Sequence, residues 1–248
     1  MKKIKLTKMI VILVIIFLIL TVFFIWQIKK YKKISSNFDK ELFLSKGYSD
    51  EEIYFFTDVG FFHEKIRKWE KNIKVEIVKI ENLKKNEIEE VDSIIKILEP
   101  LVYPIKIERV EENGNLKVYR KVLKPIKYKN REVNGKASLS LPIFLNYDIK
   151  CAKIYDAYHI NGEKTIFHEF LHALGLEHPS RLYIDFHTLL VTHKSPNIFY
   201  TIDELEEFND MKFYISEQEK QVIRMLYSSG VKSGLRRSTF IKKMGLEY

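Results

Sequence analysis

The sequence predicts an α+β domain built on a twisted mixed β-sheet, preceded by a single transmembrane helix. Three observations support this fold class: a long apolar run at residues 9–26, alternating strand-like and helix-like segments between residues 74 and 122, and a mainly helical pattern after residue 162. About 215 residues follow the apolar run, which suits one domain. We therefore expect a membrane anchor with basic flanks at 1–33, a polar linker at 34–48 and a folded domain at 49–248.

The N-terminal apolar run extends from Met9 to Trp26 and is interrupted only by Thr21. Its eighteen residues nearly fill the hydrocarbon core of a bilayer. A secretory signal has a shorter apolar region and a small-residue cleavage site, whereas residues 27–30 read Gln-Ile-Lys-Lys. The pattern favours an uncleaved, single-pass signal anchor, with a cleaved signal peptide as the alternative.

The lysines on the two sides of this run do not decide its orientation. Four lysines precede it within residues 2–8, and four follow it within residues 29–33. The positive-inside rule therefore assigns neither side of the run to the cytoplasm. The short N-terminal tail favours an anchor that places the folded domain outside the cytoplasm.

The charge of the chain is concentrated in the anchor. The formal net charge is +9, and residues 1–33 contribute +8 through eight lysines and no acidic residue, which leaves +1 for the rest. The domain therefore lacks the basic footprint of a nucleic-acid-binding protein. Cys151 is the only cysteine, so no intramolecular disulfide forms, and we expect it in the core.

Local patterns predict the elements of the first half of the domain. Ser49 and Glu52 form a capping-box signature for a helix that continues through Phe56, and a second helix is expected over 61–69. Residues 74–80 are rich in Val and Ile and predict a strand. Apolar residues at helical spacing predict a helix over 86–98, which ends near Pro100.

Two further strands are predicted over 105–110 and 116–122. Turn-forming residues at 112–115 separate them, so we expect the two strands to form a hairpin. Near the C-terminus, Ser216 and Glu219 form a second capping box for a helix through about Ser228, with Met225 in the core. Residues 230–248 are expected to form a short amphipathic tail.

Residues 168–178 fit the pattern HExxHxxGxxH at every fixed position. His168 and His172 lie four residues apart, so on a helix they share one face and reach one metal ion. Gly175 tolerates the left-handed backbone that ends a helix, after which His178 can become a third ligand. Three His with one open position is typical of catalytic zinc, and Glu169 beside it is suited to act as general base. Chance would produce this pattern on the order of 10⁻⁵ times per chain.

This pattern resembles that of the metzincin group of zinc metallopeptidases. Residues 135–142 are similar to the edge strand with which metzincins hold an extended substrate, and residues 152–156 to the inner strand before the active-site helix. The Met-containing turn beneath the metal is matched by residues 195–200, with Phe199 at the Met position. The likeness covers roughly residues 73–230.

The resemblance implies a membrane-anchored, zinc-dependent endopeptidase that acts on a peptide or protein substrate. His168, His172 and His178 would bind Zn²⁺, and Glu169 would be the general base toward a zinc-activated water. Phe199 supports the alternative of a catalytically inactive, zincin-like binding or scaffold protein at the membrane. His187 and His193 lie between the third His and the turn, where each is either a further ligand or donor or a loop residue.

Overall fold

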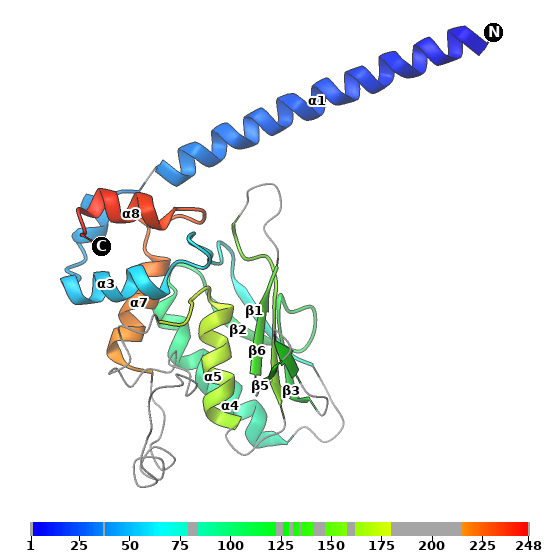
Figure 1. Cartoon of the computed structure of the whole chain (residues 1–248). Helices are drawn as coiled ribbons and strands as arrows, with labels where there is room; N and C mark the ends of the chain where they lie inside the picture. Colours follow the sequence, from blue (N-terminus) through cyan, green and yellow to red (C-terminus); the bar gives the residue numbers. More distant parts are fainter. Residues whose placement is uncertain are drawn as a thin grey trace.

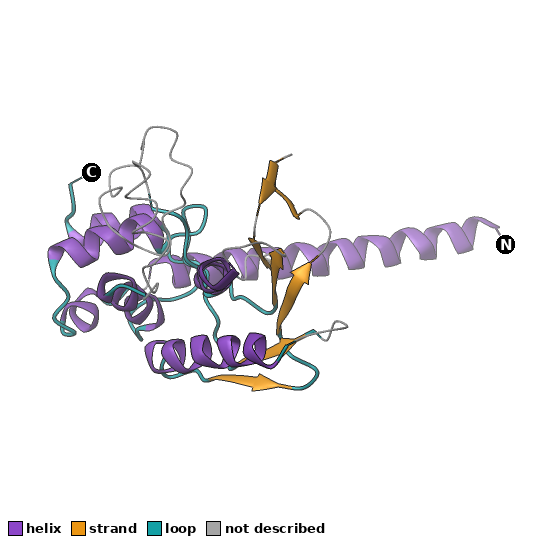
Figure 2. Cartoon of the chain, turned by 90° about the horizontal axis from the view of Figure 1, so that it is seen from below, coloured by secondary structure: helices purple, strands orange, loops and turns teal. Residues whose placement is uncertain are grey.

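The computed structural model describes residues 2–36, 38–78, 84–122, 126–128, 131–133, 135–140, 147–157, 162–179 and 215–247. Over these ranges the chain forms a mixed α/β body and one long N-terminal helix that extends away from it (Figure 1). The strands occupy one side of the body, while α3 (Asp50–Val59), α7 (Glu217–Tyr227) and α8 (Arg237–Met244) gather on the other (Figures 1 and 2).

The main sheet has five strands, four of which are parallel to one another. In spatial order they are β2 (Ile107–Val110), β1 (Ile73–Ile77), β3 (Leu116–Val122), β7 (Ala152–Ala157) and β6 (Gly135–Leu139). The terminal strand β6 is the antiparallel member, so the predicted mixed sheet is confirmed. A separate two-stranded sheet pairs β4 (Ile126–Tyr128) with β5 (Arg131–Val133).

The predicted hairpin of β2 and β3 is wrong, because β1 lies between them and both strands run parallel to it. Val75 of β1 is opposite Arg109 on one side and Leu116 on the other. The connection between β2 and β3 passes close to β1 at Gly114, where an added Cβ would lie 2.5 Å from the Cβ of Glu76. Turn-forming residues at 112–115 therefore carry the chain across a strand and do not reverse it.

Helix α1 (Lys2–Ser36) contains the apolar run, and its segment Met9–Lys30 is long and apolar enough to cross a membrane. None of that segment is buried inside the protein. A signal sequence has the same length and composition, so these properties alone leave both interpretations open.

The segment predicted as a polar linker contains α2 (Lys40–Leu44), which begins at the N-cap Asp39. Phe38 and Phe43 are buried in the core, and the Phe38 ring lies 4.8 Å from the ring of Phe240. Two aromatic side chains in a mostly polar stretch are thus enough to fix this segment to the domain.

Helix α3 (Asp50–Val59) begins with the predicted capping box of Ser49 and Glu52, in which each side chain bonds the other residue's main chain. The helix predicted over 61–69 is wrong. His63 and Glu64 have positive φ angles of 47° and 67°, and they make a tight turn that no right-handed helix contains. The rest of the segment is extended.

The remaining helices confirm the predicted patterns. Helix α4 (Lys85–Leu98) is followed by a 3₁₀ turn (Glu99–Leu101), while α7 (Glu217–Tyr227) and α8 (Arg237–Met244) make the C-terminal part helical. Ser216 and Glu219 cap α7 as predicted, and Met225 is fully buried.

Cys151 is exposed, which corrects the expectation of a core cysteine. It directly precedes β7, in which Ala152 is buried and Lys153 exposed. Because side chains alternate between the faces of a strand, an inward Ala152 places the preceding residue outward.

Candidate metal centre

The metal-binding motif begins on α5 (Gly162–Ala173), which packs against β6 and β7. Ile166, Phe170 and Leu171 are buried and hold the helix to the sheet. His168 and His172 lie one turn apart on a neighbouring face of this helix, as their spacing predicts.

Gly175 ends this part of the chain in a conformation that requires glycine. Its φ is +108°, and an added Cβ would lie 1.9 Å from the main-chain oxygen of Arg67. The N–H of Gly175 donates to the carbonyl of His172 at 2.9 Å, and the N–H of Leu176 donates to that of Leu171 at 3.2 Å. These bonds satisfy carbonyls at the end of the helix and turn the chain back toward its last turn.

The turn brings His178 to the two helical histidines. One ring nitrogen from each of His168, His172 and His178 lies within 4.8 Å of the others. The Nε2 atoms of His168 and His172 are 3.0 Å apart. Three imidazoles that converge in this way could hold a metal ion, so the structure groups the three residues that the motif predicts as ligands.

His172 has the hydrogen bond that a metal-binding imidazole usually makes with its second nitrogen. Its Nδ1 lies 2.8 Å from the carbonyl oxygen of Leu176, so an Nδ1–H donates there and Nε2 is left with its lone pair. Burial lowers the pKa of His172 well below its usual range, and the neighbouring His168 and His178 lower it further. The ring is therefore neutral, the form that binds a metal.

Two buried aromatic residues hold the end of α5, and neither was singled out from the sequence. The indole Nε1 of Trp69 donates to the carbonyl of Ala173 at 2.9 Å, and the hydroxyl of Tyr227 donates to that of Leu174 at 3.0 Å. The carbonyls at a helix end need such partners. Because these contacts span more than fifty positions, no local pattern announces them.

Glu169 lies beside the terminal strand of the sheet and is 6% exposed. Burial raises its pKa to about 8, a hydrogen bond from the main-chain N–H of Ala137 on β6 lowers it, and the charge of Asp156 raises it. Burial therefore gives this carboxyl a higher proton affinity than a solvent-exposed glutamate has.

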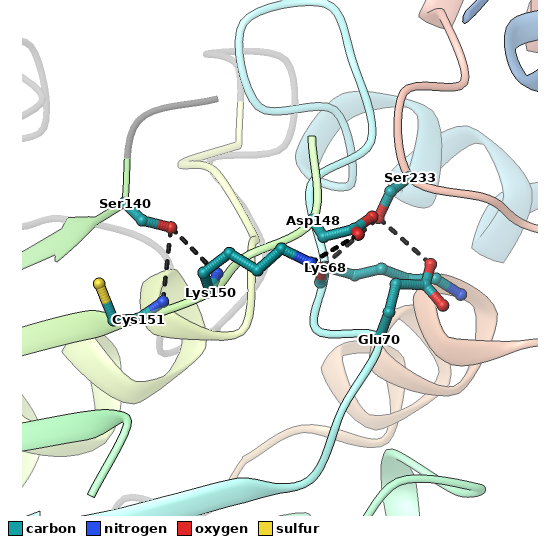
Figure 3. Close-up of polar contacts among 7 residues, drawn as sticks. All are labelled: Lys68, Glu70, Ser140, Asp148, Lys150, Cys151 and Ser233. Carbon is teal, nitrogen blue, oxygen red and sulfur yellow. Dashed lines mark hydrogen bonds and ion pairs between the residues drawn. The ribbon is translucent and has the colours of Figure 1, made fainter. Parts of the chain in front are cut away.

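The strands around α5 lie where the sequence places them. β6 is the terminal strand, and β7 is the inner strand that precedes the helix. Beyond β6, the hydroxyl of Ser140 accepts the main-chain N–H groups of Lys150 at 3.0 Å and Cys151 at 3.4 Å (Figure 3). The guanidinium of Arg67 donates to the carbonyl of Ser140, which ties the end of β6 to the segment beneath Gly175.

A second buried charged group lies under the sheet and was also missed from the sequence. Arg120 on β3 contacts Glu90 of α4 at 2.7 Å and Asp156 of β7 at 3.0 Å. Burial raises the pKa of Asp156 to about 6, although Arg120 opposes this shift. The charge of Asp156 also raises the pKa of Glu169, so this group acts electrostatically on the candidate metal centre.

Several predicted features lie outside the described residues. They are the turn at 195–200 with Phe199, the substrate-strand residues 141 and 142, and His187 and His193.

Comparison with known proteins gave no match: no protein-family model matches the sequence, and no curated protein is significantly similar to it. A functional conclusion therefore depends on the geometry of the site, in which three histidines converge beside a buried glutamate and the terminal strand of a sheet.

Proposed function

We propose that the chain is a membrane-anchored zinc metallopeptidase of the metzincin type, which hydrolyses peptide bonds. The observation that carries the proposal is the convergence of His168, His172 and His178 next to a buried Glu169. The α1 helix would hold the enzyme at the membrane, with the catalytic domain outside the cytoplasm.

The three histidines suit zinc because neutral imidazoles are common zinc ligands and three of them leave a position open. The hydrogen bond from His172 to the Leu176 carbonyl supports this, since it directs Nε2 toward the other two rings. When bound, zinc supplies Lewis-acid polarisation of a carbonyl and lowers the pKa of water to near neutrality.

Glu169 would be the general base. Its carboxylate takes a proton from the attacking water, whose oxygen forms the new bond to the scissile carbonyl carbon. The same carboxyl then gives the proton to the leaving amine as the C–N bond breaks. The raised pKa of Glu169 supports the second role, because a carboxyl of high proton affinity holds the proton until the leaving amine takes it.

β6 would bind the substrate as an additional, extended strand. A terminal strand offers main-chain donors and acceptors to a peptide, and this mode of recognition depends little on the substrate's side chains. The hydrogen bond between Ala137 and Glu169 supports this assignment, because it places the general base next to the same strand.

The first test is the zinc content of the full-length protein beside that of the His172→Ala variant. We expect about one zinc per chain in the native sequence and a large loss in the variant, because a His₃ site loses a ligand. A folded native protein that takes up no zinc when zinc is supplied would refute the proposal.

The second test is hydrolysis of an unstructured protein by the native chain and by Glu169→Gln. The variant should keep its zinc and lose hydrolysis, and a chelator should abolish the activity of the native chain. Zinc binding without hydrolysis in the native chain would instead favour the non-cleaving zincin-like binding protein that Phe199 suggests.

A further inference from the structure

The connection between α1 and the folded domain is very short. Helix α1 ends at Ser36, and two residues later Phe38 is 4% exposed in the core. Its ring packs 4.8 Å from Phe240 and 5.4 Å from Phe43. A helix in the bilayer would therefore be joined to the domain by almost no free chain.

This connection limits how far the domain can stand from the membrane. The segment long enough to cross the membrane ends at Lys30, and the six residues from there to Ser36 extend a helix by about 9 Å. Two residues can span at most about 7 Å. The headgroup layer takes up roughly 5–8 Å of that height. Phe38 therefore lies within about one helix diameter of the headgroups, and any tilt of α1 brings it closer.

Helices α2 and α8 are the elements held at this height. The ammonium of Lys243 on α8 donates to the carbonyl of Phe38 at 3.0 Å, and that of Lys40 on α2 donates to the carbonyl of Met244 at 3.3 Å. Both helices lie beside the domain end of α1 (Figure 1). They form one surface, which we call the juxtamembrane face and define by the exposed residues Asp39, Lys40, Glu41, Leu42, Leu44, Lys46, Lys242 and Lys243.

The juxtamembrane face combines apolar groups with four lysines and two acidic residues, Asp39 and Glu41. Leu42 and Leu44 are each 39% exposed on either side of the fully buried Phe43. Apolar side chains among lysines are the composition with which surface helices enter the headgroup region.

Net charge distinguishes this end of the molecule from the rest of the domain. Residues 34–48 and 236–248, which follow the anchor and contain α2 and α8, together carry +3, whereas residues 49–235 carry −2. An anionic lipid surface attracts each basic residue near it by about 1 kcal/mol, and it repels a domain of net negative charge. The charge therefore favours an orientation in which α2 and α8 face the lipid.

We propose that the juxtamembrane face binds the anionic lipid surface and so fixes the orientation of the catalytic domain on the membrane. The proposal rests on α1 being a retained anchor, which is part of the proposed function. It adds a second, peripheral contact that a flexible tether would not make.

The test uses the full chain in nanodiscs, with a single fluorescent probe attached to an introduced cysteine. Cys151→Ser removes the exposed native thiol. Leu44→Cys then places the probe on the juxtamembrane face, and Glu89→Cys places it on α4, at the opposite end of the body in Figure 1. Discs contain equal amounts of phosphatidylglycerol and phosphatidylcholine, or phosphatidylcholine alone, each with a nitroxide-headgroup lipid as quencher.

We expect several-fold stronger quenching at position 44 than at 89, and a decrease when phosphatidylglycerol is omitted. Lys46→Glu should weaken quenching at position 44, while Lys96→Glu on α4 should not. Equal quenching at both positions would overturn the proposal. So would protection of position 44 from an aqueous quencher without nitroxide quenching, because a second copy or another protein would then cover this face.

The anchor is tested separately by flotation of proteoliposomes after an alkaline wash. Retained protein with an unquenched position 44 would reject the lipid contact and leave the anchor in place. Protein that the wash removes would reject the anchor itself.

Discussion

Replacement of Gly175 by alanine tests the link between backbone geometry and the metal centre. Gly175 has φ +108°, and its added Cβ would lie 1.9 Å from the main-chain oxygen of Arg67. Real Cβ atoms essentially never approach another atom within 3.0 Å, so one of the two main chains must move by roughly 1 Å. This movement lies only three residues from His178.

The expected cost has two parts. A positive φ costs a residue with a Cβ about 1–2 kcal/mol. Overpacking against a rigid main chain adds about 1–3 kcal/mol. Gly175→Ala should therefore lower the free energy of unfolding by about 2–5 kcal/mol. The same displacement should weaken zinc binding, because His178 reaches the other ligands only through this turn.

Gly47→Ala is the matched control, because Gly47 has φ +75° and nothing within 4 Å of its added Cβ. It should lose only the conformational part, about 1–2 kcal/mol, and leave zinc affinity unchanged. Unfolding of the full chain in detergent, followed by tryptophan fluorescence, measures the first quantity, and competition with a chelator measures the second. Equal destabilisation by the two substitutions would refute the argument from the Arg67 contact.

Three further predictions follow from buried contacts. Trp69→Phe leaves the buried carbonyl of Ala173 without its donor. It should lower the free energy of unfolding by about 1–3 kcal/mol and also weaken zinc binding. Gly114→Ala brings a Cβ against Glu76 and should lower the free energy of unfolding by about 1–3 kcal/mol. Zinc affinity should not change, so denaturant unfolding should detect the substitution and a zinc titration should not. Asp156 has a folded pKa of about 6 against a usual 3.8, so its contribution to stability is full below pH 3.8 and is lost as pH rises through 6. Asp156→Asn should remove that part of the pH dependence of unfolding, and an unchanged profile would show that the group does not titrate there.

The sequence predicts the three-histidine cluster well because its geometry is local. His168 and His172 converge through helical spacing alone, and Gly175 sits where only glycine tolerates both the φ angle and the close approach. Capping boxes predict α3 and α7 for the same reason, since Ser49 and Ser216 act within three residues. The residues that stabilise the site, such as Trp69, are distant in sequence and carry no such signal.

The hairpin prediction failed because local patterns contain no information about a third strand. Residues 112–115 have the composition of a reversal, but β1 competes for both neighbours and binds β2 and β3 on opposite sides. Cys151 is exposed for a similar reason. The alternation of buried and exposed side chains in β7 begins with the buried Ala152, and the sequence alone does not show where this strand begins. Strand partners follow from the tertiary fold, which local propensity does not determine.

The segment 65–69 shows why an extended conformation prevails over a helix here. A helix would use its main-chain groups internally, whereas the extended segment uses them to join distant parts of the fold. Ile66 exchanges hydrogen bonds of 2.9 Å with Leu235 and Gly234, and the carbonyl of Lys68 accepts the N–H of Ile149 at 2.9 Å.

The same segment also reaches the metal centre and the terminal strand. Arg67 contacts Gly175 through its carbonyl and Ser140 through its guanidinium, while Trp69 holds the end of α5. The segment 65–69 therefore connects three parts of the fold: the C-terminal helical part, the helix that carries the histidines and the strand proposed to bind substrate. Because α8 belongs to that C-terminal part, a lipid contact there would also fix the orientation of the metal centre relative to the membrane.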